Sequence, residues 1–200
     1  MQKPRIVILA GPNGAGKTTV SKYLLRDALE ISEFVNADYI ATGLSGFDPE
    51  SVAFEAGRIM LKRIDALIAE HANFAFETTL ASRSLLKLIR EAKTLGYRVE
   101  LYYLALPTAK LAEARVALRV RTGGHNIPRE VIARRFYRSL NNLFNLYLPE
   151  VDEWHIFDNS RTQVPSLIAS GTRKSRTIES ENKWHALQAL AEKAKSQSIK

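Results

Sequence analysis

Residues 11–18, Gly-Pro-Asn-Gly-Ala-Gly-Lys-Thr, have the composition and spacing of a phosphate-binding loop. Its glycines let the backbone curl so that successive N–H groups point at phosphate oxygens, and the helix that follows adds its positive end. Lys17 is placed to reach the β- and γ-phosphates of a nucleotide, and the Thr18 hydroxyl is placed to bind Mg²⁺. The alternative is a chance glycine turn with an exposed lysine. A buried strand predicted before the loop and a helix predicted after it favour phosphate binding.

An aspartate follows the second predicted strand. Asp38 lies just after residues 33–36, and ligands of open α/β sheets bind beyond the carboxyl ends of the strands. At that place its carboxylate could accept a proton from an acceptor hydroxyl. The alternative is that Asn36 or Asp38 caps a short helix at residues 39–41. The sequence leaves both interpretations open.

The third predicted strand, residues 73–77, ends in the same way at Glu77-Thr78-Thr79. Glu77 can bind a substrate or a metal-bound water, or it can be a strand-end carboxylate followed by a helix cap. The position at the ligand-facing edge of the sheet favours the functional interpretation.

Arginine is concentrated in one segment. The chain has a net charge of +8, and residues 115–138 carry +6 of it. Diffuse basicity would indicate nucleic-acid binding, whereas a local arginine cluster indicates a phosphate chain. We therefore predict a mobile lid that brings arginine to a transferring phosphoryl group; a solvated basic face is the alternative. The seven arginines are Arg115, Arg119, Arg121, Arg129, Arg134, Arg135 and Arg138.

Strand and helix patterns alternate along the chain, which predicts an α/β fold of the P-loop NTPase or kinase type. We expect a parallel five-stranded sheet with helices on both faces and an Arg-rich lid at about residues 115–138. The expected strands are 5–10, 33–36, 73–77, 97–106 and 154–157. The expected helices are 17–28, 48–71, 82 or 84 to 95, 108–121 and 129–147. A hairpin and a terminal helix are expected at about residues 165–196, all within a single domain spanning residues 1–200.

Composition bounds the class of protein. Two hundred residues with 46% hydrophobic and 25% charged content are ordinary for one globular domain. The absence of cysteine excludes a disulfide scaffold, a cysteine nucleophile and a thiolate metal site. The longest apolar runs are shorter than a membrane span, and the first one is too short for a signal peptide, so we expect a cytoplasmic protein without membrane contact.

The sequence lacks the signature motifs of two classes of nucleotide-binding protein, the GTPases and the transporter-type ATPases. Residues 182–185, Asn-Lys-Trp-His, lack the acid of the GTPase N-K-x-D element, and residues 44–47 hold only a fragment of the transporter signature L-S-G-G-Q. A small P-loop kinase remains.

The chain resembles the zeta-toxin-like P-loop kinases, and in particular their chromosomal branch, often labelled predicted ABC-type ATPase. The resemblance runs in order over residues 5–160. It rests on residues 11–18, 35–38 (Val-Asn-Ala-Asp), 76–79 (Phe-Glu-Thr-Thr), Arg119 with 123–128 (Gly-Gly-His-x-x-Pro), 134–140 and 157–160 (Phe-Asp-Asn-Ser).

This resemblance implies a kinase that transfers the γ-phosphoryl group of ATP to a hydroxyl of a UDP-activated amino sugar such as UDP-N-acetylglucosamine. It implies the toxin of a toxin–antitoxin pair, blocked by a small antitoxin. The expected cofactors are ATP and Mg²⁺, with Thr18 as metal ligand. Expected catalytic residues are Lys17, Asp38, Arg119 and Arg134. Expected nucleotide-binding residues are Gly11, Pro12, Asn13, Gly14, Ala15, Gly16, Lys17, Thr18, Thr19 and Asn159. Expected substrate-binding residues are Glu77, Thr79, Arg121, His125 and Arg138.

The sequence departs from the family pattern at two places. His125 stands where the better-known members have a second lid arginine, so Arg121, Arg134 or Arg138 is expected to supply that cation. The E-x-T element is Glu-Thr-Thr, without a central glycine. Two other functions stay open: a small-metabolite or nucleic-acid 5′-OH kinase, and a non-catalytic nucleotide-binding regulator.

Overall fold

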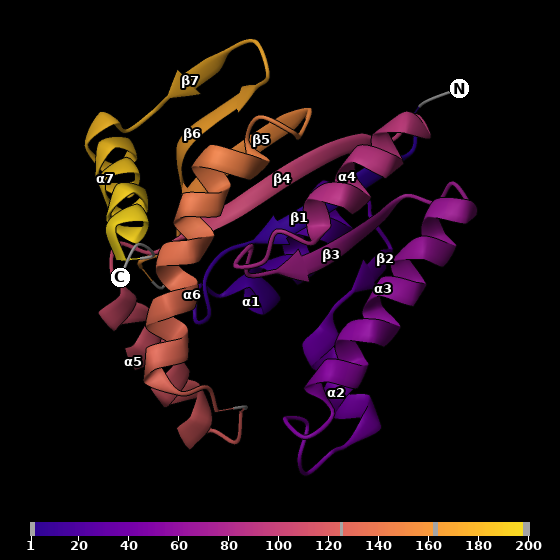
Figure 1. Ribbon diagram of the computed structural model, residues 1–200, viewed down its shortest axis with the longest axis horizontal. Coiled ribbons are helices and arrows are strands. Elements are labelled where there is room, and N and C mark those ends of the chain that lie inside the picture. The colour runs from indigo at the N-terminus through magenta and orange to yellow at the C-terminus, as the bar shows by residue number, and fades with distance from the viewer. Residues whose placement is uncertain (1–2, 125, 162–163, 198–200) are drawn as a thin grey trace.

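The computed structural model describes residues 3–124, 126–161 and 164–197. Within them one twisted sheet has the strand order β2-β3-β1-β4-β5-β6-β7 (Figure 1). The strands are β1 (Arg5–Ala10), β2 (Glu33–Val35), β3 (Phe74–Thr78), β4 (Arg98–Ala105), β5 (Glu153–Asp158), β6 (Ser166–Thr172) and β7 (Arg176–Ile178).

The expected five strands all form, and their neighbours pair in parallel. The expected sheet size is wrong, because the sheet has seven strands. The hairpin expected near residues 165–180 forms as β6 and β7, and β6 pairs antiparallel with β5. That pairing satisfies backbone groups that β5 would otherwise expose at the edge of the sheet.

The helical segments alternate with the parallel strands. They are α1 (Lys17–Ser21), the π-helical η1 (Lys22–Ala28), α2 (Ala37–Leu44), α3 (Ala53–Ala69), α4 (Leu85–Thr94), α5 (Ala109–Arg121), α6 (Arg129–Asn142), the π-helical η2 (Leu143–Tyr147) and α7 (Glu181–Gln197). Leu29 N–H donates to Leu24 O and Leu148 N–H to Leu143 O, the five-residue spacing of a π-helix.

The sheet is covered from both sides, as expected. The β1 strand is fully buried over residues 6–10, and β4 is almost as buried. On one face the Tyr103 hydroxyl of β4 hydrogen-bonds the Ser139 hydroxyl of α6 at 2.8 Å. On the opposite face Arg5 of β1 donates to Leu29 O at the end of η1, at 3.4 Å. Because both faces of these strands are buried, their sequences are continuous apolar runs.

The expected helix at residues 48–71 is wrong in its first turn. A separate helix, α2, precedes it, and α3 begins only at Ala53. Asp48, the first residue of the expected helix, lies in a turn instead, where its Oδ1 accepts from Ser51 N–H. A proline at position 49 fits such a turn as well as it fits a helix start, so local composition did not distinguish the two.

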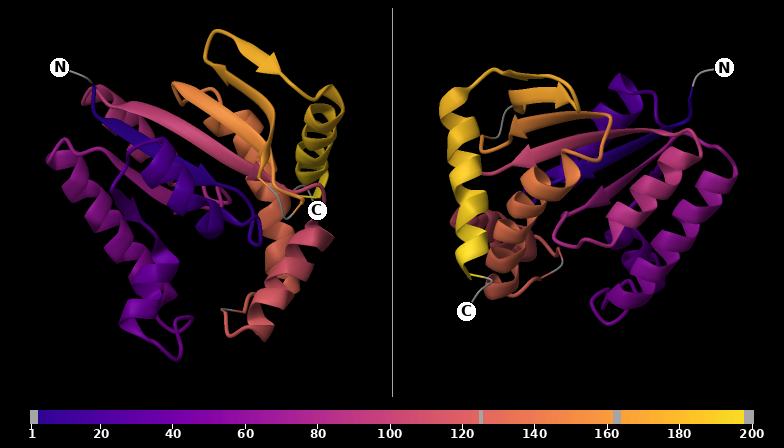
Figure 2. Two further views of the ribbon diagram at one scale, coloured as in Figure 1. Left: turned by 180° about the vertical axis from the view of Figure 1, so that it is seen from behind. Right: turned by 45° about the horizontal axis from the view of Figure 1, so that its top comes forward.

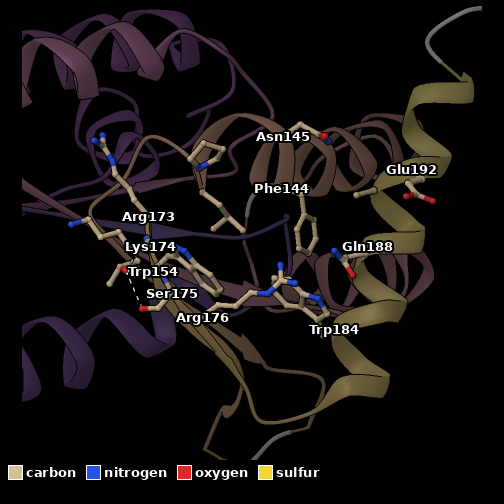
Figure 3. Close-up of a pocket in the computed structure, with 14 residues that line it drawn as sticks. Phe144, Asn145, Trp154, Arg173, Lys174, Ser175, Arg176, Trp184, Gln188 and Glu192 are labelled. Atoms are coloured by element: carbon tan, nitrogen blue, oxygen red, sulfur yellow. Dashed lines mark hydrogen bonds between the residues drawn. The ribbon is translucent and has the colours of Figure 1, made fainter.

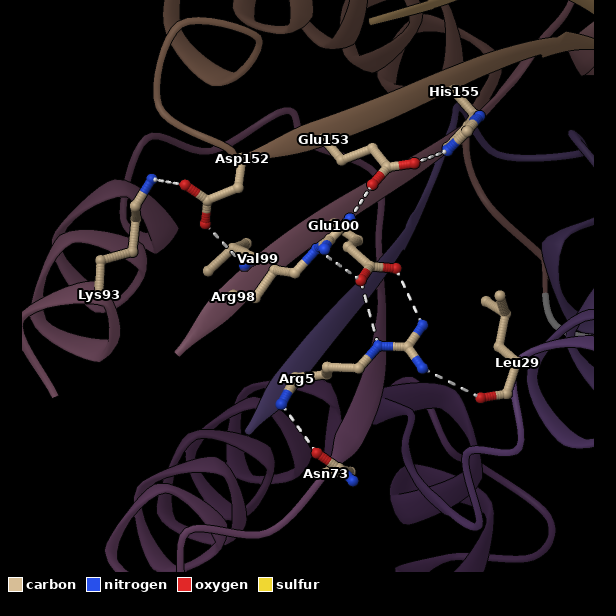
Figure 4. A network of polar contacts seen from close by, with 10 residues as sticks. All are labelled: Arg5, Leu29, Asn73, Lys93, Arg98, Val99, Glu100, Asp152, Glu153 and His155. Atoms are coloured by element: carbon tan, nitrogen blue, oxygen red, sulfur yellow. Dashed lines mark hydrogen bonds and ion pairs between the residues drawn. The ribbon is translucent and has the colours of Figure 1, made fainter. Parts of the chain in front are cut away.

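Polar side chains at the amino-terminal ends of β1, β4 and β5 form a network of ion pairs (Figure 4). The buried Glu100 carboxylate accepts from Arg5 Nε and Nη2 at 3.1 and 3.0 Å, and Arg98 pairs with it from β4. Glu153 pairs with Arg98 and with His155 Nε2. Burial acts to raise the pKa of Glu153, but the hydrogen bonds with His155 and Arg98 outweigh it and the pKa is lowered. These acids hold the sheet together at the edge away from residues 11–18.

The carboxyl ends of the parallel strands lie between two projecting helix pairs. Figures 1 and 2 show α2 and α3 extending past the sheet on one side and α5 and α6 on the other. Over the described residues, no helix is both long and apolar enough to cross a bilayer.

Candidate active site

The turn between β1 and α1 depends on its glycines, as Gly11 and Gly16 show. Gly11 has φ 146°, and a Cβ added there would lie 2.4 Å from Leu104 O of β4. Gly16 has φ 81°, and an added Cβ would lie 2.7 Å from Asn159 Nδ2. Both the left-handed backbone and the close approach of neighbours exclude a side chain. The loop therefore curls tightly at the carboxyl end of β1.

Lys17 is held inside this loop. Its side chain is 6% exposed, and its Nζ donates to Gly11 O at 3.0 Å and to Pro12 O at 3.1 Å. The same ammonium lies 3.6 Å from Glu77 Oε1. A cation held at this point by the loop's own carbonyls is pre-positioned for an anion in the loop.

The Glu77 carboxylate accepts hydrogen bonds from Thr18 and Asn36. Parallel pairing of β1 with β3 sets Leu9 opposite Glu77, so the carboxylate lies beside the loop. Thr18 Oγ1 donates to its Oε2 at 3.1 Å, and Asn36 Nδ2 donates to the same oxygen at 2.8 Å. Glu77 therefore lies at the carboxyl-end edge of the sheet, where the sequence placed it.

Asn36, not Asp38, is the cap of α2. The Asn36 Oδ1 accepts from Asp38 N–H at 2.7 Å and from Tyr39 N–H at 3.3 Å. The structure therefore confirms the helix-cap interpretation for Asn36 and leaves the Asp38 carboxylate outside the cap. Within the described residues the Asp38 carboxylate is exposed and has no hydrogen bond or ion pair. It is therefore available to a ligand.

These residues share one cavity of about 590 Å³. The phosphate-binding loop and the carboxylates of Asp38 and Glu77 line it, together with α3, the segment after β3, and the two lid helices α5 and α6. Among the residues predicted from sequence, those that line it are Asn13, Gly14, Gly16, Lys17, Thr18, Thr19, Asp38, Glu77, Thr79 and Arg119.

The lid arginines are arranged differently from our expectation. The second lid cation was expected from Arg121, Arg134 or Arg138, but these three are exposed and do not line the cavity, whereas Arg135 does. Consecutive helical residues differ by about 100°, so Arg134 and Arg138 both lie about 200° from the buried Phe136, on the outer face of α6. The expected residue His125 lies outside the described residues.

Arg115 is a cavity residue that our sequence interpretation did not select. Its guanidinium donates to Asn159 O at 2.6 Å and to Ser160 O at 2.9 Å, which ties α5 to the loop after β5. The spacing of Arg115 in the sequence could have indicated that it lines the cavity, because Arg115 and Arg119 are four residues apart and share one face of α5. An added Cβ at Gly124 would lie 2.5 Å from Arg119 Cγ, so the loop after α5 packs directly on the Arg119 side chain.

A second hollow adjoins the other side of the loop. Asn159 Nδ2 donates to Ala15 O at 2.7 Å, which places the predicted Asn159 against the phosphate-binding loop. The hollow, of about 420 Å³, shares Gly14, Gly16, Thr19 and Arg115 with the first cavity. It is further lined by Val20, Tyr23, Asn159, Arg161, Val164 and Pro165.

A cavity of about 650 Å³ lies elsewhere, between the β6–β7 hairpin, η2 and α7 (Figure 3). The stacked rings of Trp154 and Trp184 line it, and Arg176 lies 5.5 Å from the Trp184 ring centre. None of the residues predicted for chemistry lines this cavity. The candidate active site is therefore the cavity at the phosphate-binding loop.

Comparison with known proteins agrees with the class that the fold and site define, an α/β P-loop kinase fold. The chain belongs to the AAA domain family, whose model matches residues 6–139. An uncharacterized protein of Haemophilus influenzae is 29% identical over 132 residues, which are 66% of this chain and 92% of that protein.

Two solved structures share the fold. A chain of the crystal structure of AvrRxo1-ORF1:-ORF2 with ATP matches with a TM-score of 0.72 and 18% identity, covering 92% of this chain and 63% of that chain. A chain from the PezAT chromosomal toxin–antitoxin system of Streptococcus pneumoniae matches with a TM-score of 0.66 and 17% identity, covering 100% of this chain and 89% of that chain. At the level of the fold, they confirm the predicted resemblance to zeta-toxin-like P-loop kinases.

Proposed function

We propose that the protein is a kinase that transfers the γ-phosphoryl group of ATP to a hydroxyl of a UDP-activated amino sugar such as UDP-N-acetylglucosamine. The observation that carries this proposal is the shared cavity. It combines a buried Lys17 in a phosphate-binding loop with an unpaired Asp38 carboxylate, and arginines face it from the lid. A non-catalytic nucleotide-binding protein would need Lys17 in the phosphate-binding loop, but it would need neither the Asp38 carboxylate nor the arginines.

The nucleotide in this proposal spans both hollows at the loop. Its phosphates lie against residues 11–18, where backbone N–H groups and Lys17 meet them. Its base lies in the second hollow, near Arg115, Asn159 and Pro165. The phosphate chain then points toward Asp38 and the lid arginines.

The residues present fit Mg²⁺. Hydroxyl and carboxylate oxygens are its preferred protein ligands, and Thr18 Oγ1 and Glu77 Oε2 lie 3.1 Å apart beside the loop. Among the described residues no cluster of three or more His, Cys, Asp or Glu can hold a metal. When bound, Mg²⁺ neutralises charge on the β- and γ-phosphates.

Asp38 in this proposal is the general base. Its carboxylate takes the proton of the acceptor hydroxyl as that oxygen forms a bond to the γ-phosphorus. The bond from the γ-phosphorus to the bridging oxygen breaks, and ADP leaves with that oxygen. Lys17 and the lid arginines stabilise the charge on the transferring group.

We also propose the wider role that the resemblance implies. Residues 1–200 act as one kinase domain in the cytoplasm, with a lid at about residues 115–138, and a small antitoxin blocks the nucleotide site. The PezAT likeness supports a toxin–antitoxin role, since that system consists of such a pair.

The direct test is incubation of the protein with γ-labelled ATP and separate acceptors: UDP-N-acetylglucosamine, other UDP-sugars, small sugar acids and a 5′-OH oligonucleotide. We expect label in UDP-N-acetylglucosamine, released as inorganic phosphate by phosphatase. Label in a sugar acid or the oligonucleotide instead would establish one of the alternative kinases. ATP binding without transfer to any acceptor or to water would contradict a kinase.

A series of lid variants tests the arrangement of the arginines. We expect Arg119→Ala to lower kcat the most, by about 10³-fold, because this arginine lies on the cavity face of α5. Arg135→Ala should follow, and Arg134→Ala and Arg138→Ala should stay within about threefold of wild type, less than 1 kcal/mol each. Single-turnover rates measure this. A flat profile, or a larger loss at Arg134 than at Arg135, would reject the cavity-facing assignment.

A further inference from the structure

The helix α3 contains a glycine that the fold does not require. Gly57 lies in the second turn of this 17-residue helix, where glycine is unfavourable relative to alanine. Its backbone is not among the left-handed glycines of the described residues. Apart from its chain neighbours and the adjacent backbone of α3, no atom of the described residues lies within 4 Å of a Cβ added to it. Neither conformation nor packing within the chain explains the glycine.

The open space beside Gly57 belongs to the cavity at the phosphate-binding loop. Ala53, Gly57 and Met60 line it from one side of α3, at the spacing of a single helix face. The same cavity is also lined by side chains that can hydrogen-bond or carry positive charge, among them Thr78, Thr79, Ser82, Ser84 and Arg135. The cavity therefore combines an apolar helix face with hydrogen-bonding groups.

The nucleotide does not use this space in the proposed arrangement. Its phosphates lie at residues 11–18 and its base at the second hollow, and no residue of α3 lines that hollow. The only proposed reactant left for the space is the acceptor, whose hydroxyl must reach Asp38. Asp38 lines the same cavity from the start of α2.

We propose that Gly57 is a specificity-determining residue: its missing side chain leaves room for the ring of a hydroxylated, anionic acceptor. The ring lies against α3, its hydroxyls face the Thr and Ser side chains, and its anionic group faces Arg135. This inference rests on the proposed function, because it assigns the acceptor half of the same cavity.

The chain contains no cysteine, so one engineered thiol can report on this space. Gly57→Cys places it in the cavity. Gly43→Cys is the matched control, because Gly43 is also helical and also has open space at its Cβ, but does not line the cavity. Each variant is modified with methyl or benzyl methanethiosulfonate, with and without UDP-N-acetylglucosamine, other UDP-sugars and sugar acids.

We expect at least one of these compounds to slow modification of Gly57→Cys by about tenfold or more, with no effect on Gly43→Cys. The benzyl adduct on Gly57→Cys should raise the KM for that compound strongly, while ATP affinity and slow hydrolysis of ATP by water stay within about threefold. Gly57→Ala should fold with an equal or higher Tm, which controls for damage to α3.

Protection by none of the compounds, or equal protection at both positions, would overturn the inference. A benzyl adduct that lowers ATP affinity as much as acceptor affinity would also overturn it, because the space would then belong to the nucleotide. Failure of the proposed function would give a different result. Wild-type protein would then transfer no label to a UDP-sugar, regardless of which compound protects the thiol of Gly57→Cys.

Discussion

Lys17→Ala is expected to lower phosphoryl transfer strongly and to weaken ATP binding. In the free protein the ammonium is buried against two loop carbonyls and Glu77, so its charge is already desolvated and aimed at the phosphate position. Charge-assisted hydrogen bonds are worth about 1.5–3 kcal/mol each. Losing two such bonds from Lys17 to the nucleotide phosphates lowers kcat/KM by roughly 10²–10⁴-fold. Rates measured with γ-labelled ATP and ATP affinities from calorimetry check the result.

Lys22→Ala is the matched control for this change. Lys22 is exposed at the start of η1, five residues beyond Lys17, and lines neither hollow at the loop. Its loss should leave rate and affinity unchanged. Transfer by Lys17→Ala at a near wild-type rate would contradict the assignment of residues 11–18 as the phosphate-binding loop.

Asp38→Asn is expected to lower kcat by about 10²–10⁴-fold, the usual contribution of a general base, with little change in ATP affinity. Asparagine keeps the shape of the side chain but cannot take the proton of the acceptor hydroxyl. The helix start should survive, because the cap comes from Asn36 and needs only the backbone N–H of Asp38. An unchanged Tm with a reduced kcat therefore separates chemistry from folding.

Two other outcomes for Asp38→Asn would change its assigned role. A higher KM with the same kcat would make Asp38 a binding group for the acceptor. Unchanged kcat and KM would remove it from the site altogether. Asp27→Asn, on the exposed side of η1 and away from both hollows, serves as the control for loss of one surface charge.

Much of this site could be predicted because its geometry is local. Residues 11–18 need only their own glycines and the flanking strand and helix to form a phosphate-binding loop. The position of Glu77 at the carboxyl-end edge of the sheet also followed from sequence, because residues that end parallel strands lie at one edge of a sheet; its contact with Lys17 came from the structure. The alternation of apolar runs and amphipathic segments predicted the five parallel strands for the same reason: each pattern is set by the residues of one element.

Other features depended on contacts between distant segments. The order of the lid arginines follows from the rotation of α6 about its axis, which is fixed by packing of Phe136 into the core, and so Arg135 faces the cavity instead of Arg134. Arg115 gained its role only because the loop after β5 presents the carbonyls of Asn159 and Ser160 to it.

The sequence by itself determined the phosphate-binding loop, the two carboxylates beyond the strands and the alternating α/β order, because each is encoded in neighbouring residues. The tertiary structure alone decided which arginines enter the cavity, which residue caps α2, and that a hairpin extends the sheet to seven strands. It also revealed that Gly57 borders open space in the cavity. These features depend on how separate elements pack against one another, and spacing along the chain does not specify that packing.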